Sequence, residues 1–227
     1  MYSRFNVKQF CQRKIRKIRH RKGYGVHSPF AYGLITKVIE EKSGYYAYKQ
    51  IEDLHRTLHD RQNFNKRKCR LLFRLANRFK PRCIIECGSE DGYSTLYLQK
   101  GCPTARLFCI EPDPIRRATA EQLLMHLPGN VTYIDRTIPE EELDQHLIYL
   151  HSLSDASQYQ EAFEKISPHL CEKSIIIIDG IRQEKGIFRV WENFSRNEKI
   201  RVTFDLYNLA IAICNPKLNK QNYIVAF

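Results

Sequence analysis

The sequence predicts an α/β fold in which a mostly parallel β-sheet has helices on both faces, an antiparallel hairpin at the C-terminus and a helical extension at the N-terminus. Two observations predict it. From residue 80 onward, short apolar runs alternate with longer segments of helical periodicity. The runs are apolar at nearly every position, as in strands that a parallel sheet buries on both faces. A length of 227 residues suits one such domain.

Residues 1–22 form a basic arm. They hold nine Lys and Arg and no acidic residue, so only +3 of the net charge of +12 belongs to the rest of the chain. Within 5–19 the apolar residues recur at helical spacing, which predicts a basic amphipathic helix. Such a helix packs against another surface or contacts a polyanion, either nucleic acid or an anionic membrane surface. Because a free helix would expose its apolar stripe to water, we favour a homodimer contact.

Residues 23–79 read as a helical segment. Ser28-Pro29 has the form of an N-cap followed by proline at the first helical position, and the helix it begins is expected to run to about Ser43. Helical patterns return at 49–60 and over Lys66–Phe79. We expect 23–79 to act as a lid or cap on a core formed by residues 80–227.

The core contains two sets of predicted strands. The parallel set is Cys83–Cys87, Arg106–Ile110, Val131–Ile134, Leu147–Leu150 and Ser174–Ile178, separated by helical patterns at 93–100, 114–126 and 156–170. The second set follows Trp191 and comprises Arg201–Phe204, Leu209–Cys214 and Asn222–Phe227, with a turn signal at Asn215-Pro216. This second set predicts the antiparallel hairpin that closes the sheet.

Composition argues against several classes of protein. No apolar run reaches 18 residues, which argues against a membrane-spanning helix, and the N-terminus lacks the apolar core of a secretory signal. We therefore expect a cytoplasmic protein. The eight cysteines are scattered without a Cys-x-x-Cys pair, which is typical of reduced, buried thiols and not of zinc ligands.

The strongest functional signal is the strand, turn and helix over residues 84–95. Gly88 and Gly92 flank the turn, where glycine permits backbone angles that other residues resist and a close approach to a ligand. In open α/β sheets, ligands bind at the carboxyl ends of the strands. The next strand ends in Glu111, about twenty residues on, where a carboxylate can accept the hydroxyls of a ribose.

The turn also favours one kind of ligand. It has no Gly-Lys-Ser/Thr sequence of the type that binds a pyrophosphate, and it contains two acidic residues, Glu90 and Asp91. Acidic side chains suit a cationic head group. An adenosine that carries an ammonium and a sulfonium therefore fits the turn better than NAD or ATP.

This pattern resembles the class I S-adenosylmethionine-dependent methyltransferases, in their small bacterial, catechol O-methyltransferase-like branch. The resemblance runs from about Gly23 to Phe227, and 25–30 and 205–211 also resemble one bacterial subgroup. It implies a Rossmann-like core, S-adenosyl-L-methionine as cofactor, and methyl transfer to oxygen or nitrogen of a small-molecule acceptor. The cofactor-binding residues it implies are Glu86, Gly88, Ser89, Asp91, Gly92, Ser94 and Glu111, with an adenine-contacting segment at Arg136 and Thr137.

The catalytic chemistry departs from the catechol-type pattern. That pattern has a divalent metal bound by an Asp after the fourth strand and an Asp-Asn pair after the fifth. Here His151 replaces the first and Asp179-Gly180 the second, and one imidazole with one carboxylate is a poor ligand set for magnesium. We therefore expect no metal, and name His151 and Asp179 as candidate catalytic residues that assist deprotonation of the acceptor.

Two other interpretations stay open. Since both metal positions have changed, the chain can be a non-catalytic relative that binds S-adenosylmethionine or a partner. It can also be a nucleic-acid methyltransferase anchored by the basic arm, although no Asp/Asn-Pro-Pro-Tyr motif follows the fourth strand. The sequence does not identify the methyl acceptor.

Overall fold

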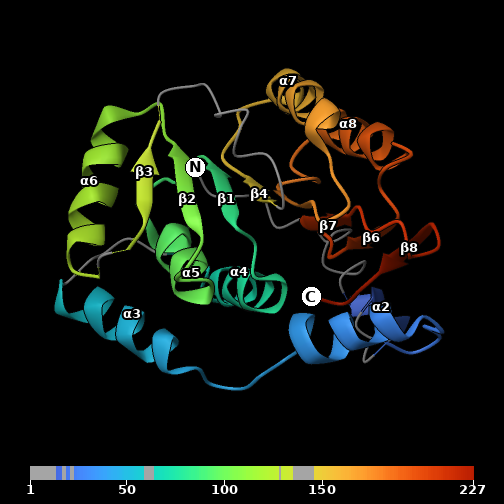
Figure 1. Ribbon diagram of the computed structural model, residues 1–227, viewed down its shortest axis with the longest axis horizontal. Helices are drawn as coiled ribbons and strands as arrows, with labels where there is room; N and C mark the ends of the chain where they lie inside the picture. Colours follow the sequence, from blue (N-terminus) through green and yellow to red (C-terminus); the bar gives the residue numbers. More distant parts are fainter. Residues whose placement is uncertain (1–13, 17–18, 21–22, 59–63, 128, 135–145) are drawn as a thin grey trace.

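The computed structural model describes residues 14–16, 19–20, 23–58, 64–127, 129–134 and 146–227. Its centre is one eight-stranded sheet in the order β3-β2-β1-β4-β5-β7-β6-β8 (Figure 1). The parallel strands are β1 Cys83–Cys87, β2 Arg106–Ile110, β3 Val131–Tyr133, β4 His146–Leu150 and β5 Ile175–Asp179. The order reverses between β1 and β4, and that reversal places a ligand-binding crevice beyond the carboxyl ends of these two strands.

Helices cover both faces of this sheet. They are α2 Pro29–Leu34, continued by a π-helical turn η1 Ile35–Ile39, α3 Tyr46–Thr57, α4 Lys66–Phe79, α5 Tyr93–Gly101, α6 Pro114–Met125, α7 Ala156–Ile166 with the 3-10 turn η3 Ser167–His169, and α8 Lys185–Ser195. Polar side chains begin several of them. Ser28 caps α2, Asp113 caps α6 and Asp155 caps α7, each by accepting from backbone N–H groups of the first turn.

The alternation of side chains along the strands divides the core into two layers. Ile84 packs with residues of α2, η1 and α4, whereas its neighbour Ile85 packs with α7 and α8. Figure 1 shows the same division, with α4 and α5 on one side of the sheet and α7 and α8 on the other. The segment 23–79 thus shares its core with the sheet. Its role as a lid remains a prediction.

The parallel strands and the helices α4, α5 and α6 lie within one residue of the predicted bounds, and the antiparallel hairpin is confirmed. Helix α3 begins three residues before the predicted start at 49, and α7 ends at Ile166, where the 3-10 turn η3 follows. The hairpin consists of β6 Val202–Asp205 and β7 Leu209–Ile213. The turn at Asn215-Pro216 leads instead to β8 Gln221–Ile224, which pairs in parallel with β6. Because β5 and β6 occupy both edges of β7, the outer edge of β6 is the position left for β8.

The helix that begins at Ser28 ends earlier than predicted. The N–H of Glu40 donates to the carbonyl of Ile35 at 2.8 Å, a wider turn than the α-helix has, and the helical geometry stops there. Within the described residues, no helix is long and apolar enough to cross a membrane.

The described part of the basic arm lies against the C-terminal strands of its own chain. The Arg16 guanidinium donates to both carboxylate oxygens of Asp205, at 2.8 and 3.1 Å, and the N–H of Ala226 donates to the carbonyl of His20. Burial alone would raise the pKa of Asp205, but hydrogen bonds from Arg16 and Arg182 outweigh it and lower that pKa. Ile15, in the same helical turn, stays 50% exposed. The remaining residues of the expected arm helix, including Val7, Phe10 and Ile18, lie outside the described part.

Candidate functional site

The turn between β1 and α5 has the strained backbone that the two glycines were expected to allow. Gly88 and Gly92 have φ of +86° and +84°, and Glu90 between them has φ of +49°. A Cβ at Gly88 would lie 2.3 Å from the carbonyl oxygen of His151, and one at Gly92 would lie 2.9 Å from Cβ of Ala120. The close approach that requires glycine is therefore to β4 and α6 of the protein itself.

Glu86 holds this turn in place through hydrogen bonds to its buried carboxylate. Its side chain is fully buried, and its carboxylate accepts from Ser94 Oγ at 2.5 Å and Thr95 Oγ1 at 2.6 Å. His151 Nε2 lies 3.1 Å from Glu86 Oε1. Burial alone would raise the pKa of Glu86, but the hydrogen bond and charge of His151, followed by the two hydroxyl donors, hold that pKa below its usual value. Glu86 is thus an ionised carboxylate that joins β1, α5 and the end of β4.

The partner of Glu86, His151, is held on three sides. Its ring stacks on Tyr149 with the centroids 4.2 Å apart, and its side chain is almost entirely buried. The second ring nitrogen, Nδ1, lies 3.3 Å from Ser152 Oγ. When the Nε2–H donates to Glu86, Nδ1 carries the free lone pair. The candidate base therefore has one nitrogen fixed by Glu86 and the other beside the Ser152 hydroxyl.

Glu111, the expected ribose-binding residue, braces the same turn from β2. Its two carboxylate oxygens accept the N–H groups of Glu90, at 2.8 Å, and Asp113, at 3.1 Å. The Glu90 carboxylate in turn accepts the Ser152 hydroxyl, so the loops that follow β1, β2 and β4 are connected. Each Glu111 oxygen keeps a further lone pair for an added donor.

A cavity of about 210 Å³ opens above this turn. It brings together four of the predicted site residues, Ser89, Asp91, Ser94 and His151, and adds Phe64, Asn65, Lys68, Cys69, Glu90 and Tyr93. The other predicted residues with described positions, Glu86, Gly88, Gly92, Glu111 and Asp179, are not in the lining. Arg136 and Thr137 lie outside the described residues.

Two buried hydroxyls near the turn are poorly satisfied. Ser89 Oγ and the hydroxyl of Tyr133, at the end of β3, are both shielded from solvent and interact with each other, but neither makes a well-formed hydrogen bond within the described structure. An unsatisfied buried hydroxyl costs about 1–3 kcal/mol, so such groups are normally paired with protein, water or ligand. These two positions are therefore where a polar ligand would be stabilised.

Lys68, from the first turns of α4, supplies a cation to this site. Its Nζ lies 2.6 Å from Asp179 Oδ2 at the end of β5, with both side chains about one-fifth exposed. Burial alone would lower the pKa of Lys68, but the charge and hydrogen bond of Asp179 raise it, so the ammonium persists at neutral pH. The Asp179 carboxylate also accepts the N–H of Gly180.

Solved structures with a similar fold are described as methyltransferases. The O-methyltransferase TomG of Streptomyces achromogenes, crystallised with SAM, has a TM-score of 0.56 and 16% identity, over 76% of this chain and 91% of TomG. The methyltransferase PaMTH1 of Podospora anserina, bound to SAH, has a TM-score of 0.59 and 15% identity, over 83% and 97%. The Bacillus cereus O-methyltransferase in complex with SAH has a TM-score of 0.55 and 16% identity, over 81% and 96%. This chain shares the fold of these proteins.

Sequence similarity to curated proteins is confined to a short segment. The chain is 40% identical over 58 residues to the transmembrane O-methyltransferases of Homo sapiens and Macaca mulatta. The match covers 25% of this chain and only 20% of either relative. No protein-family model matches the chain. The expected resemblance is thus confirmed at the level of the fold.

The side chains that follow β4 and end β5, His151 and Asp179, do not fit a divalent metal. Asp179 is engaged by Lys68, and His151 by Glu86. In the part of the chain that the structure describes, no three His, Cys, Asp or Glu residues are grouped to hold a metal ion. Magnesium requires several oxygen ligands, which this pair does not supply. Independence from metal remains a prediction.

The sequence analysis missed Lys68 as a site residue. It lies in the run Lys66-Arg67-Lys68, which has the appearance of a solvated helix start. The signal that identifies it is helical phase, because Lys68 is spaced by four and seven residues from Leu72 and Leu75, both fully buried. A lysine on the buried face of an amphipathic helix needs an acidic partner, and Asp179 is that partner.

Proposed function

We propose that this protein is an S-adenosylmethionine-dependent methyltransferase that acts on a hydroxyl of a small molecule. The observation that carries the proposal is the cavity at the β1–α5 turn, which lies at the switch point of a fold shared with O-methyltransferases and is lined by the buried, poorly satisfied Ser89. The similar structures TomG and PaMTH1 hold SAM and SAH, respectively. Oxygen is favoured over nitrogen as the acceptor atom because the structures that share the fold are described as O-methyltransferases.

The proposed cofactor contacts divide into two groups. Ser89, Asp91 and Ser94 line the cavity and would hold the methionine end, where Asp91 supplies the negative charge that an ammonium needs. Glu111 would accept the ribose hydroxyls, with Tyr133 close to the adenosine and Arg136 and Thr137 toward the adenine. Glu86, Gly88 and Gly92 would act by fixing the shape of the turn.

The bound cofactor would supply an electrophilic methyl group, and the chain has to orient the acceptor oxygen and remove its proton. We assign proton removal to Nδ1 of His151, because the ionised Glu86 fixes the other nitrogen and stabilises the imidazolium that forms. Lys68, held by Asp179, would stabilise the negative charge that develops on the acceptor oxygen. Most of the rate would come from positioning in a site that excludes water.

Calorimetric titration of the full chain with S-adenosylhomocysteine tests the cofactor assignment. Labelled S-adenosylmethionine offered with a panel of hydroxylated and amino acceptors then tests the reaction. Binding without transfer to any acceptor would favour the non-catalytic alternative, and absence of binding would contradict the proposal.

Two finer expectations belong to the same proposal. We propose a cytoplasmic location, which agrees with seven free thiols among the described residues. We also propose a homodimer, with the 50% exposed Ile15 and the apolar residues before it as the contact.

A further inference from the structure

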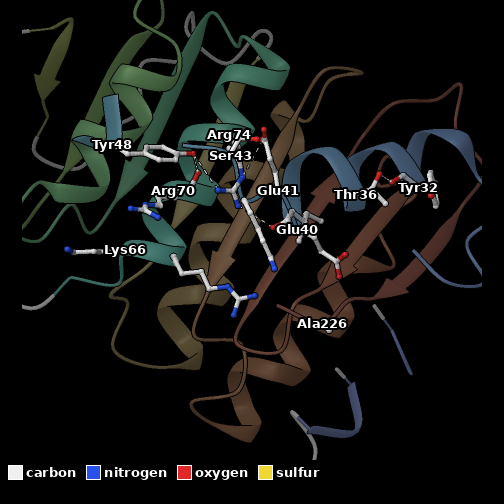
Figure 2. A pocket seen from close by; sticks show the side chains of 13 residues that line it. Tyr32, Thr36, Glu40, Glu41, Ser43, Tyr48, Lys66, Arg70, Arg74 and Ala226 are labelled. Atoms are coloured by element: carbon white, nitrogen blue, oxygen red, sulfur yellow. Dashed lines mark hydrogen bonds and ion pairs between the residues drawn. The ribbon is translucent and has the colours of Figure 1, made fainter. Parts of the chain in front are cut away.

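A second and larger cavity lies on the other side of α4. It has a volume of about 960 Å³ and is bounded by the segment 32–43, by α4, by Tyr48 and by Ala226 (Figure 2). Figure 2 shows Lys66, Arg70 and Arg74 along one side of it, with Glu40 and Glu41 toward the other. Its residues are distinct from those of the cavity at the β1–α5 turn. The volume falls in the usual range for small-molecule sites.

The charge of this cavity is strongly unbalanced. Five cationic side chains line it against two carboxylates: Lys42, Lys66, Arg67, Arg70 and Arg74 against Glu40 and Glu41. Helical periodicity places Arg67, Arg70 and Arg74 on one face of α4, where Arg74 is buried and the other two are nearer to the surface. A concave surface of one sign concentrates ligands of the opposite sign.

Arg74 forms the buried floor of the cavity. It is 5% exposed, and its guanidinium donates to the carbonyls of Val38 and Ile39, at 2.6 and 3.2 Å, where the π-helical turn ends. The Glu41 carboxylate lies 3.9 Å away, so the charge of Arg74 is only partly compensated. Arg74 is thus fixed by the fold and maintains a positive potential in the cavity.

Two further cations form no close ion pair within the described residues. No described carboxylate lies within 4 Å of Arg67 or Lys42, and Arg67 packs over the ring of Phe227, at 4.4 Å. Arg70 and Lys66 are by contrast held by Glu52. Burial and the neighbouring charge of Arg74 lower the pKa of Arg67, and the charge of Glu40 opposes this shift only in part. A bound anion would relieve this repulsion.

We propose that this cavity binds a diphosphate-bearing small molecule of nucleotide size. The positive charges of the lining exceed the negative ones even when Glu52, which holds Arg70 and Lys66, is counted, and guanidinium groups bind phosphate oxygens in pairs. A volume of about 960 Å³ is larger than a free diphosphate needs, and the lining includes the half-exposed ring of Tyr32, which suits an attached base.

Titration of the full chain with pyrophosphate and with ADP, at low and at moderate ionic strength, tests the proposal. We expect both to bind, with affinity that falls as salt rises, and ADP to bind more tightly if the base contributes. Arg67→Glu should weaken binding about tenfold or more. Lys42→Glu, on the opposite wall, should give a similar loss and serves if the first variant misfolds.

The matched control is Arg78→Glu, which makes the same change at an exposed position on the same helix, outside the cavity. It should leave ADP affinity unchanged, and Arg67→Glu should leave S-adenosylhomocysteine affinity unchanged, so failure of this proposal is separable from failure of the methyltransferase proposal. No binding of either probe at low salt would overturn it. Equal losses of ADP affinity in the Arg67 and Arg78 variants would also overturn the proposal. Tighter binding of a single-stranded RNA than of ADP would do the same, because either result indicates a diffuse surface for polyanions.

Discussion

The two sides of the first turn of α4 differ in how their charges are satisfied. Lys68 points to the carboxyl ends of the strands and is paired with Asp179, whereas its neighbour Arg67 lies on the opposite face, beside other cations. Near Lys68, the buried charges form pairs, as Glu86 does with His151. On the Arg67 side the positive charges exceed the negative ones. Paired charges hold side chains in a fixed geometry, which suits catalysis. An excess of positive charge is neutralised when an anion binds, which suits ligand binding.

The largest expected effect comes from the glycine turn on the paired side. Gly88→Ala should destabilise the protein by at least about 3 kcal/mol, since the added Cβ would lie 2.3 Å from a carbonyl oxygen in a backbone with positive φ. S-adenosylhomocysteine binding should be lost with it. The matched control is Gly25→Ala, where φ is +75° but nothing lies within 4 Å. That change should cost only about 1–2 kcal/mol, measured by chemical denaturation. Equal costs would show that the close contact with β4 is not what requires glycine.

A smaller loss of stability is expected when the charge of Glu86, in its buried pair with His151, is removed. Glu86→Gln should cost about 3 kcal/mol at pH 7, because His151 and two hydroxyl donors lose the charge that they surround. The folded-state pKa of Glu86 is lowered, so its stabilisation is complete above the unfolded-state pKa of about 4.3 and is lost as the pH falls through the folded-state value. The difference between wild type and variant should therefore shrink in acid. Denaturation curves at pH 7 and pH 3 check this, and a constant difference would contradict it.

Substitutions of the adjacent residues Lys68 and Arg67 test whether the two sides of α4 differ in their role in methyl transfer. Lys68→Met should lower the rate of methyl transfer by about ten- to a hundredfold, because the acceptor oxygen loses its cation, and should leave S-adenosylhomocysteine affinity within about threefold. Arg67→Met, one residue away, should leave the rate unchanged. Single-turnover rates with labelled cofactor separate the two. A similar loss in both variants would indicate a general effect of α4 on folding.

The smallest effect on stability is expected for changes in the basic arm. Arg16→Ala should cost about 1 kcal/mol or less, since Arg182 also donates to both Asp205 oxygens, at 2.9 and 2.6 Å. Deletion of residues 1–22 should leave S-adenosylhomocysteine affinity nearly unchanged, because these contacts are at β6 and not at the β1–α5 turn. Light scattering of the truncated chain tests the homodimer. A dimer that survives the deletion would place its contact elsewhere.

The parts of the fold that depend on local periodicity were predictable. Lys66–Phe79, Cys83–Cys87 and Arg106–Ile110 have the predicted bounds. The helix has regularly spaced apolar residues and the two strands are short, mostly apolar runs, each between clear breaks. The pairing of β8 with β6 was not predictable, since strand order depends on which sheet edges remain open. The end of the first helix at Ile39 was missed because Arg74, 35 residues away in sequence, satisfies its last carbonyls.

The candidate site was predictable to a similar extent. The motif located the turn, and Ser89, Asp91, Ser94 and His151 lie around one cavity. The motif did not reveal that Glu86 and His151 are partners, which depends on the register that places β1 beside β4. Nor did it reveal the larger cavity, whose walls come from segments far apart in the chain.

The position of β7 in the sheet determines which strands are expected to unfold together. Among the described strands, β6 and β8 are connected to the parallel part of the sheet only through β7, which pairs with β5. Separation of β7 from β5 would release β6 and β8 together, along with Asp205 and the Arg16 that it holds. These strands would then form one cooperative unit in native-state hydrogen exchange, with a common opening free energy below that of β1 and β4.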